Sequence, residues 1–233
     1  MRRLIMVMIF KLSEELLFPP PVLARDDGLL AVGGDLSVER LLLAYSMGIF
    51  PWYSEGDPLL WWSPDPRMVL VPAEFHCSRR LARTLRQDIF RVTFDQDFAR
   101  VIKSCAAPRS GLEGTWIVPE MQEAYIRLHE EGWAHSVECW QGKELVGGLY
   151  GVSLGGFFFG ESMFSRVADS SKVALATLAA QLVAWDFDLI DCQMNTSHLL
   201  SLGAREISGL DFGRQLQASL QRPTRRGRWS GGP

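Results

Sequence analysis

The chain has 233 residues, of which 47% are hydrophobic and 22% are charged, and its formal net charge is −3. The apolar content excludes a wholly disordered chain, and the net negative charge excludes a protein that coats nucleic acid by bulk charge, although a local basic patch stays compatible with it. No apolar run approaches the roughly 20 residues that a membrane span needs, so we expect no membrane partner.

The N-terminus begins with two arginines and the apolar run of residues 4–10. Because this run is short, stops at Lys11 and has no small-residue cleavage site directly behind it, it favours a buried strand over a secretion signal. The four cysteines lack C-x-x-C spacing and the four histidines lack H-x-x-x-H spacing. We therefore expect reduced thiols in a cytoplasmic protein, no metal site and no cofactor.

Residues 19–66 are interrupted by proline and glycine, which predicts short elements joined by turns. Ser37 is the predicted N-cap of a helix that runs to about Met47 and ends at Gly48. Most of the aromatic residues between Trp52 and Trp62 are interpreted as core residues. We place a small N-terminal domain at residues 1–68.

Longer periodic segments follow and predict a second domain at residues 69–222. We expect strands at 91–94, 135–140, 145–152, 157–164 and 189–193, and helices at 97–107, 119–131, 170–185, 198–202 and 212–220. Ser170 or Ser171 is the predicted N-cap of the helix at 170–185. Three successive strands with short glycine-containing connections favour an antiparallel meander, and the whole pattern predicts an α+β fold. The last residues, 223–233, carry arginine and glycine but no acid and are predicted to form a mobile basic tail.

Asp191 and Gln193 are two residues apart on a predicted strand, so their side chains share one face. The preceding Leu189 and Ile190 indicate that this strand runs through the core, where an unpartnered polar group costs about 1–3 kcal/mol. A structural hydrogen-bonded pair and a catalytic pair are both compatible with this pattern.

Glu161 lies in one of the most apolar stretches of the chain, and strand alternation would put it on the same face as Phe157, Phe159 and Met163. A carboxylate there needs a cation or hydrogen-bond donors. Arg166 is the internal candidate for that cation, and a substrate is the alternative.

Arginines gather on one predicted helix, and the next acid after them along the chain is Asp88. Arg79, Arg83 and Arg86 follow the i, i+4, i+7 spacing of one helix face, with Arg80 beside them. Such a stripe is compatible with a solvated face and with contacts to nucleic-acid phosphates. Trp116 follows a glycine-bearing loop, where it could close the core or stack on a nucleobase.

Several segments, taken in chain order, resemble the leucyl/phenylalanyl-tRNA–protein transferases along nearly the whole chain. The resemblance is carried by GLLAVGGD at 28–35, GIFPW at 48–52, WWSPDPR at 61–67, EGTWI at 113–117, LVGGLYG at 145–151, GESMFSR at 160–166, IDCQ at 190–193 and SLGA at 201–204. Such enzymes transfer Leu, Phe and less often Met from aminoacyl-tRNA to the N-terminal Arg or Lys of an acceptor protein, which marks that protein for N-end-rule degradation. The resemblance implies a small N-terminal domain packed on a GNAT-like acyltransferase domain, and we expect a monomer.

The resemblance also assigns roles to the residues left open above. It implies that Asp191 and Gln193 lie at the reaction centre, where the side-chain oxygen of Gln193, held by Asp191, orients the attacking amine. An amide is too weak a base to keep the proton, so we expect positioning rather than general-base catalysis. Glu161 would face the charged or amino groups of the substrate.

The remaining implied contacts concern the aminoacyl-tRNA. The amino-acid pocket would be formed by Leu149, Phe158 and Leu178, with Met163 as a further substrate contact. At positions 149 and 178 we expect Met and Phe in familiar relatives, so the preference between donors is not carried over. Trp52 and Trp116 would contact the terminal adenosine, and the tRNA phosphates would meet Arg79, Arg80, Arg83 and Arg86.

Two rival functions remain to be separated from this one. An acetyl-CoA-dependent acetyltransferase of the GNAT type would hold the pyrophosphate in a glycine-rich loop at a helix N-terminus. The corresponding loop here, residues 166–171, has no glycine and contains Asp169, which argues against CoA. A non-catalytic protein that binds tRNA or N-terminal degradation signals differs from the transferase in activity but not in residue types.

Overall fold

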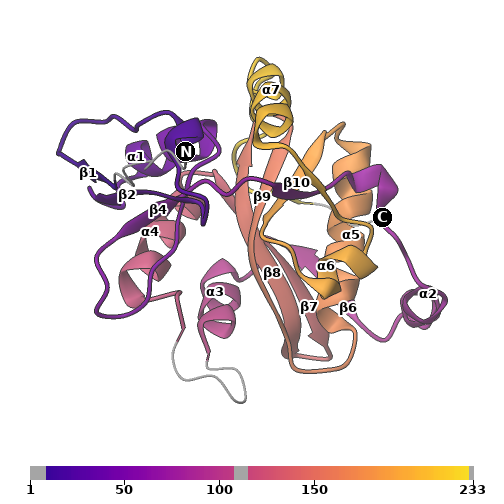
Figure 1. Ribbon diagram of the computed structural model, residues 1–233. Coiled ribbons are helices and arrows are strands. Elements are labelled where there is room, and N and C mark those ends of the chain that lie inside the picture. Colours follow the sequence, from indigo (N-terminus) through magenta and orange to yellow (C-terminus); the bar gives the residue numbers. More distant parts are fainter. Residues whose placement is uncertain (1–8, 108–114, 231–233) are drawn as a thin grey trace.

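The computed structural model describes residues 9–107 and 115–230. Within these residues the chain forms two sheets, a small one at the N-terminal side and a large one that fills the rest of the molecule (Figure 1). The small sheet has the strand order β1-β2-β4-β3 and carries one α-helix, α1. Its elements are β1 (Phe10–Leu12), β2 (Leu29–Gly33), α1 (Val38–Ser46), β3 (Phe50–Pro51) and β4 (Leu60–Trp62), with a 3-10 turn η1 at Pro21–Leu23.

The large sheet has seven strands in the order β11-β5-β10-β9-β8-β7-β6. The predicted antiparallel meander is confirmed, because β7, β8 and β9 pair in succession. The connection from β9 to β10 is a crossover through a helix, and these two strands are parallel. The strands are β5 (Arg67–Leu70), β6 (Arg91–Phe94), β7 (Ala134–Gln141), β8 (Glu144–Leu154), β9 (Phe157–Ser165), β10 (Leu189–Gln193) and β11 (Arg205–Ile207).

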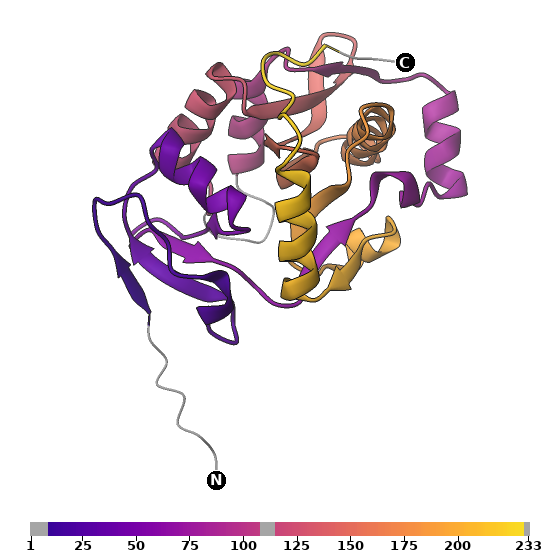
Figure 2. The same cartoon turned by 90° about the horizontal axis from the view of Figure 1, so that it is seen from above.

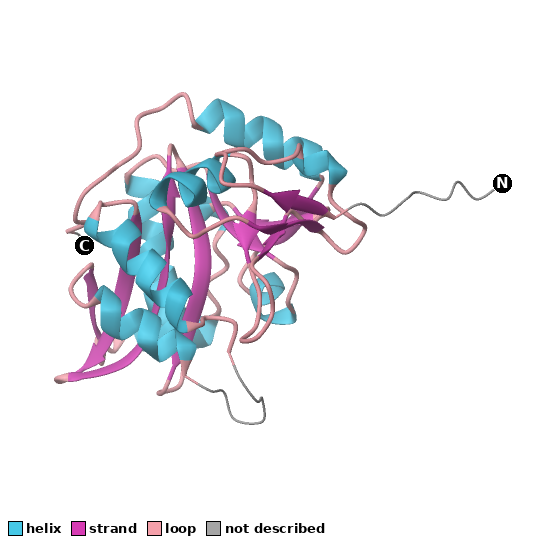
Figure 3. Cartoon of the chain, turned by 90° about the vertical axis from the view of Figure 1, so that its left-hand side faces the viewer, coloured by secondary structure: helices cyan, strands magenta, loops and turns pink. Residues whose placement is uncertain are grey.

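Helices cover both faces of the large sheet (Figure 3). The crossover helix α5 packs on β7, β8 and β9 from one side, and α3 packs on the same strands from the other, next to α4. In two views at right angles, α2 lies at the far edge of the molecule from the small sheet (Figures 1 and 2). The helices are α2 (Arg79–Arg86), α3 (Phe98–Ala106), α4 (Pro119–Glu130), α5 (Ser170–Ala184), α6 (Ser197–Ser201) and α7 (Gly209–Ser219), and η2 is a 3-10 turn at Pro72–Glu74.

Two predicted helix starts illustrate how local chemistry and tertiary contacts compete. Ser37 caps α1 as predicted, because its side chain accepts a hydrogen bond from the backbone N–H of Arg40. The predicted cap of α5, Ser170 or Ser171, is wrong: Asp169 occupies the N-cap with a φ of 66° and makes no side-chain capping bond. Ser170 instead donates its hydroxyl to the carbonyl of Val146 on β8, which ties the helix to the sheet.

The strands that the sequence pattern did not predict are all short. β2, β3, β4 and β11 have two to five residues and lie among prolines, glycines and turns, so alternation has little length in which to appear. β5 is fully buried, with no exposed face to mark it. It already belongs to the large sheet, so the two sheets are separated between Trp62 and Arg67, just before the predicted boundary at 68.

One hydrophobic cluster continues from the small sheet into the large one. Trp61 and Tyr45 of the N-terminal part and Phe159 and Tyr125 of the C-terminal part belong to it, and all four are buried. The rings of Tyr45 and Phe159 lie 5.0 Å apart between centroids. The small domain is therefore packed on the large one through a shared core.

The C-terminal segment was predicted to be mobile, and its described part is packed instead. Residues 222–230 run back over the large domain after α7 (Figure 2). Trp229 is 2% exposed, and its backbone N–H donates to Asp95 at 2.7 Å. An indole buried among aromatic side chains anchors a stretch whose polar composition alone would suggest a free tail. The predicted strand at residues 4–10 and the last three residues of the tail lie outside the described ranges, apart from residues 9 and 10.

No helix among residues 9–107 and 115–230 is long and apolar enough to cross a membrane.

Candidate active site

The site forms where the two parallel strands of the large sheet separate. β9 and β10 pair only as far as Phe159 and Asp191, after which β9 stays with β8 and β10 stays with β5. Both strands are irregular there: Glu161 is an extra residue of β9 opposite β8, and the register of β10 shifts between Asp191 and Gln193. Bulges of this kind redirect side chains, and the carboxyl ends of diverging parallel strands are a common place for ligands.

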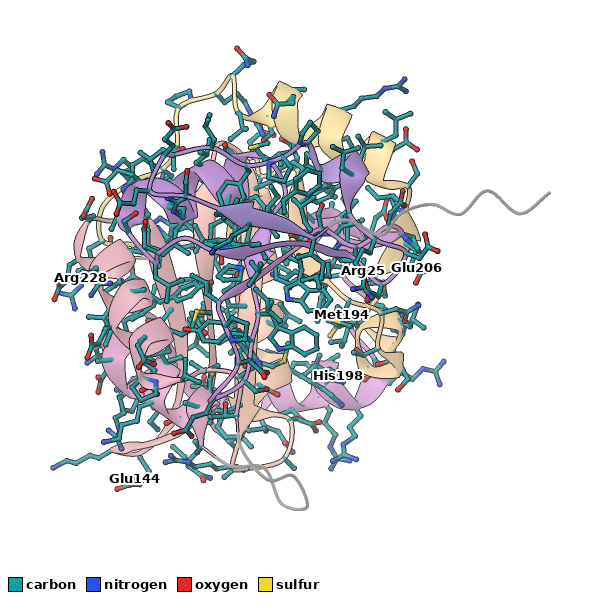
Figure 4. All side chains as sticks on the ribbon, turned by 60° about the vertical axis from the view of Figure 1, so that its left-hand side comes forward. Arg25, Glu144, Met194, His198, Glu206 and Arg228 are labelled. Carbon is teal, nitrogen blue, oxygen red and sulfur yellow. The ribbon has the colours of Figure 1, made fainter. Side chains whose placement is uncertain are left out.

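A cavity of about 440 Å³ lies at this separation. Its size is within the range of small-ligand sites. One wall is apolar and comes from β8, β9, β10 and α5: Leu149, Phe158, Met163, Leu175, Leu178 and Ile190. The small domain contributes Phe50, Pro51 and Trp52, and the loop before α4 contributes Trp116. Met194, half exposed, and His198 also line it, and both lie on one side of the molecule in Figure 4.

Asp191 lies beneath the cavity, where it is completely buried. Both its carboxylate oxygens accept hydrogen bonds from Arg67, Oδ1 from Nε at 2.8 Å and Oδ2 from Nη2 at 2.7 Å. The Arg67 guanidinium lies between the rings of Phe50 and Phe212, at 4.9 and 4.6 Å from their centroids. A bidentate pair stacked between two aromatic rings is rigid, so Asp191 is held in one orientation.

Gln193 is fixed by its backbone rather than by its side chain, which corrects the predicted arrangement. Its N–H donates to Asp191 Oδ1 at 3.0 Å, and its φ of 56° is in the left-handed region that non-glycine residues rarely adopt. That conformation costs about 1–3 kcal/mol, which the bond to Asp191 helps to offset. Asp191 thus holds the turn that directs Gln193 into the cavity, and it does not hold the amide oxygen.

Among the described residues that line the cavity, Glu161 is the only acid, and its hydrogen-bond partners come from α1, α4 and β10. Its carboxylate accepts from the hydroxyls of Tyr45 at 2.7 Å and Tyr125 at 3.1 Å, and from Gln193 Nε2 at 3.4 Å. The two tyrosine hydroxyls are also hydrogen-bonded to each other. Burial raises the pKa of Glu161 to about 7, although both tyrosine hydrogen bonds lower it.

Neither Arg166, the internal candidate partner, nor the expected position of Met163 holds for Glu161. Arg166 does not pair with it, because the guanidinium donates to Leu145 O and Ser104 Oγ and lies 5.5 Å from the ring of Phe164. Met163 does not share its face, since it packs with the second core cluster. The bulge at Glu161 shifts the alternation of β9, so that residues beyond it change faces.

The structure brings most of the predicted site residues together. Gln193, Glu161 and the proposed amino-acid pocket all line the one cavity, and so do both tryptophans. Trp52 is 36% exposed and meets Trp62 edge to face at 5.5 Å. The first two residues of the segment EGTWI before Trp116 lie outside the described ranges.

The arginines of α2 lie apart from the cavity but on a helix that packs against α5. All four are exposed, and Arg80 pairs with Asp169 at the start of α5 at 3.0 Å. Arg79, Arg83 and Arg86, which we call the arginine stripe, form no ion pair with any acid that the structure describes. The predicted stripe is therefore an exposed cationic surface, with Arg80 partly neutralised.

Three residues of the site were not predicted individually. Arg67 entered only as the last letter of a matched segment, and Tyr45 and Tyr125 were not singled out. Each tyrosine lies on the buried face of its helix, where its spacing is that of an ordinary core residue. Only the lone buried carboxylate of Glu161, which requires donors, pointed to partners of this kind.

Two features limit the chemistry. Cys192 lines the cavity, but burial raises the pKa of its thiol, so it is protonated and a poor nucleophile. At the N-terminus of α5, where an acetyltransferase would bind a pyrophosphate, the carboxylate of Asp169 lies between Arg80 and Lys172. The carboxylate thus binds the two cations that an anionic ligand at this place would otherwise meet. No cluster of three His, Cys, Asp or Glu side chains among the described residues could hold a metal ion.

Comparison with known proteins gives one consistent family. The model described as leucyl/phenylalanyl-tRNA protein transferase matches residues 69–217, and that of the N-terminal domain of the same proteins matches residues 34–65. A protein named leucyl/phenylalanyl-tRNA–protein transferase from Desulfatibacillum aliphaticivorans is 60% identical over 95% of this chain and 96% of the relative. Proteins of that name from Syntrophobacter fumaroxidans and Anaeromyxobacter are 62% and 59% identical, over 88% and 95% of this chain and 88% and 94% of theirs.

Proposed function

The chain belongs to the leucyl/phenylalanyl-tRNA–protein transferase family, and from this membership we propose how its cavity carries out the transfer. It is an aminoacyltransferase that moves leucine or phenylalanine from aminoacyl-tRNA to the N-terminus of acceptor proteins. The new bond is a peptide bond, formed when the acceptor's α-amine attacks the ester carbonyl that joins the amino acid to the terminal ribose. The tRNA leaves with its ribose hydroxyl restored.

The residue assignments rest on one observation: an apolar surface and a polar surface line the same cavity. The apolar wall that includes Leu149, Phe158 and Leu178 suits the side chain of leucine or phenylalanine. Glu161 and Gln193 lie on the same cavity and suit an amine. The reacting ester would lie between these two surfaces, with Trp52 and Trp116 next to the terminal adenosine.

Gln193 is the proposed positioning group for the attacking amine. Its Nε2 faces Glu161, and no described residue donates to its Oε1. That oxygen can accept a hydrogen bond from the amine and so align the lone pair with the carbonyl. Asp191 and Arg67 act through the backbone of Gln193 and do not touch the substrate. The proton lost by the amine can be taken by the neighbouring hydroxyl of the ribose.

Glu161 is the proposed contact for the acceptor's cationic groups. A carboxyl group with a pKa of about 7 is close to half ionised at neutral pH, and a bound ammonium or guanidinium group would favour its ionised form. This supports acceptors that begin with Arg or Lys. A cavity wall without charged groups supports Leu, Phe and Met as donor side chains.

The body of the tRNA would approach along α5 and α2. The helix α5 supplies Leu175 and Leu178 to the cavity, and α2 packs against α5 with the arginine stripe exposed. Phosphates of the acceptor stem would therefore meet the stripe while the terminal adenosine enters the cavity. We further propose that the protein is a cytoplasmic monomer and that its second domain has a GNAT-like fold. The parallel β9–β10 pair that follows an antiparallel meander supports this fold.

A direct assay tests the assignments. The protein is incubated with Leu-tRNA and a peptide that begins with Arg, and the Leu-extended peptide is detected by mass. We expect product with the wild type, a loss of at least a hundredfold in turnover for Gln193→Ala, and tRNA binding unchanged within about twofold. Gln221→Ala, in the exposed turn just after α7, is the matched control. Equal losses of binding and turnover in Gln193→Ala would refute the positioning role.

A further inference from the structure

The C-terminal segment of residues 222–229 is fastened across the large domain at several separate points. Arg222 pairs with Asp186 and Asp188, and Thr224 Oγ1 accepts from the backbone N–H of Gly155 at 2.9 Å. Further along, the guanidinium of Arg225 lies over Trp185 and that of Arg226 over Trp133. These contacts hold residues that have no regular secondary structure of their own.

Trp229 is the buried end of this segment. Its ring stacks on His135 at 3.7 Å between centroids and 6° between planes, and it meets Trp185 edge to face at 4.9 Å. Its indole N–H donates to Arg225 O at 3.1 Å. The side chain thus fills a gap in the second core cluster and has its polar atom satisfied.

One neighbour of Trp229 also lines the active-site cavity, and that neighbour is Phe158. The centroids of the two rings are 5.9 Å apart. On another side the ring of Phe158 lies against the backbone of β8, where a Cβ atom on Gly151 would come within 2.6 Å of it. Phe158 is therefore held between a strand with no side chain at that position and an indole that the C-terminal segment supplies.

The cavity side of Phe158 belongs to the apolar wall, together with Leu149 and Leu178. The shape of this wall depends on where the Phe158 ring lies. Because the side of β8 is fixed backbone, Trp229 is the movable part of the support. We infer that Trp229 is a positioning residue that sets the depth of the amino-acid pocket through Phe158, and so the discrimination between leucine and phenylalanine; the inference rests on the proposed function of the cavity.

The experiment compares the two donors in Trp229 variants. Initial rates of transfer from Leu-tRNA and Phe-tRNA to one Arg-initiated peptide give kcat/KM for each donor. Trp229→Ala leaves space behind Phe158 into which its ring can move, which deepens the pocket. We expect the ratio of Phe to Leu transfer to rise about tenfold, with the KM for the acceptor peptide unchanged. Trp229→Phe, which keeps an aromatic ring, should stay within about twofold of the wild type.

A buried tryptophan elsewhere separates this effect from lost stability. Trp140 on β7 is 6% exposed and does not line the cavity, so Trp140→Ala should lower stability without changing the donor ratio. If Trp229→Ala does not yield folded protein, Trp229→Leu takes its place, with an expected shift of at least about threefold. An unchanged ratio in a folded Trp229→Ala or Trp229→Leu enzyme overturns the inference. Wild-type protein that transfers neither amino acid would instead overturn the proposed function.

Discussion

Glu161 provides the sharpest test of the electrostatics, through the substitution Glu161→Gln. The glutamine keeps the shape, and its single side-chain oxygen can still accept a hydrogen bond from one of the two tyrosine hydroxyls while its NH2 group faces the other, but it cannot ionise. In the folded protein the pKa of Glu161 is raised from 4.5 to about 7, chiefly by burial. At about 1.4 kcal/mol per pH unit, the ionised side chain is therefore about 3 kcal/mol less stable in the fold than in the unfolded chain.

The sign of the pH dependence follows from the order of the two pKa values. Between pH 4.5 and about 7 the unfolded chain loses the proton of Glu161 while the folded chain keeps it, so the free energy of unfolding decreases as the pH rises. Above about pH 7 both states are ionised and this contribution becomes constant. The variant lacks this titration, so the stability difference between Glu161→Gln and wild type should grow by about 3 kcal/mol, in favour of the variant, from pH 4.5 to 7.5.

Urea denaturation followed by tryptophan fluorescence at half-unit pH steps measures this difference. Glu123→Gln on the exposed side of α4 is the control, and its difference from wild type should stay constant within about 0.5 kcal/mol. A Glu161→Gln difference that stays flat with pH, or that grows toward acid, would refute the burial argument.

Three further predictions concern other parts of the site. Arg67→Met leaves Asp191 buried without its cation and should lower the free energy of unfolding, measured by urea denaturation, by about 3–5 kcal/mol. The double variant Arg67→Met/Asp191→Leu should recover more than half of this loss of stability but should not restore transfer of Leu. Replacing the arginine stripe by glutamine should weaken tRNA binding and reduce the slope of log K against log[salt] by about 2–3, and an unchanged slope would place the phosphate contacts elsewhere. Leu178→Phe puts a larger side chain on the apolar wall and narrows the pocket, so the ratio of Phe to Leu transfer should fall about tenfold. A ratio that does not fall would show that Leu178 does not limit the size of the pocket.

The long periodic elements could be predicted from the sequence because their signals are local. The meander β7–β9, the strand β10 and the helices α3, α4 and α5 were predicted within a few residues. The short strands could not be, since two to five residues give no periodicity. β5 is the instructive case: it is flanked by Pro66 and Pro72 and becomes a strand only because β10 and β11 pair with it on either side.

The candidate site was predictable where one residue stood out against its own surroundings. Glu161 in an apolar strand and the pair Asp191 and Gln193 met this condition. The hydrogen bonds between these residues could not be predicted, because they depend on two bulges and on tyrosines from distant helices. A bulge changes the facing of every later residue in a strand, so alternation could not place Met163, and it could not show that Asp191 binds a backbone N–H.

The position of β5 also has a consequence for biosynthesis. Arg67 is 124 residues ahead of Asp191, its partner, and among the described strands β5 pairs with β10 and β11 alone. At 5–20 residues per second a ribosome needs roughly 6–25 s to reach the partner after it has made the arginine. During that time the apolar strand has neither of its partner strands, and Arg67 lacks its carboxylate partner. The candidate site is thus among the last parts of the large sheet to form, and the nascent chain carries an unpaired β5 that a chaperone could recognise.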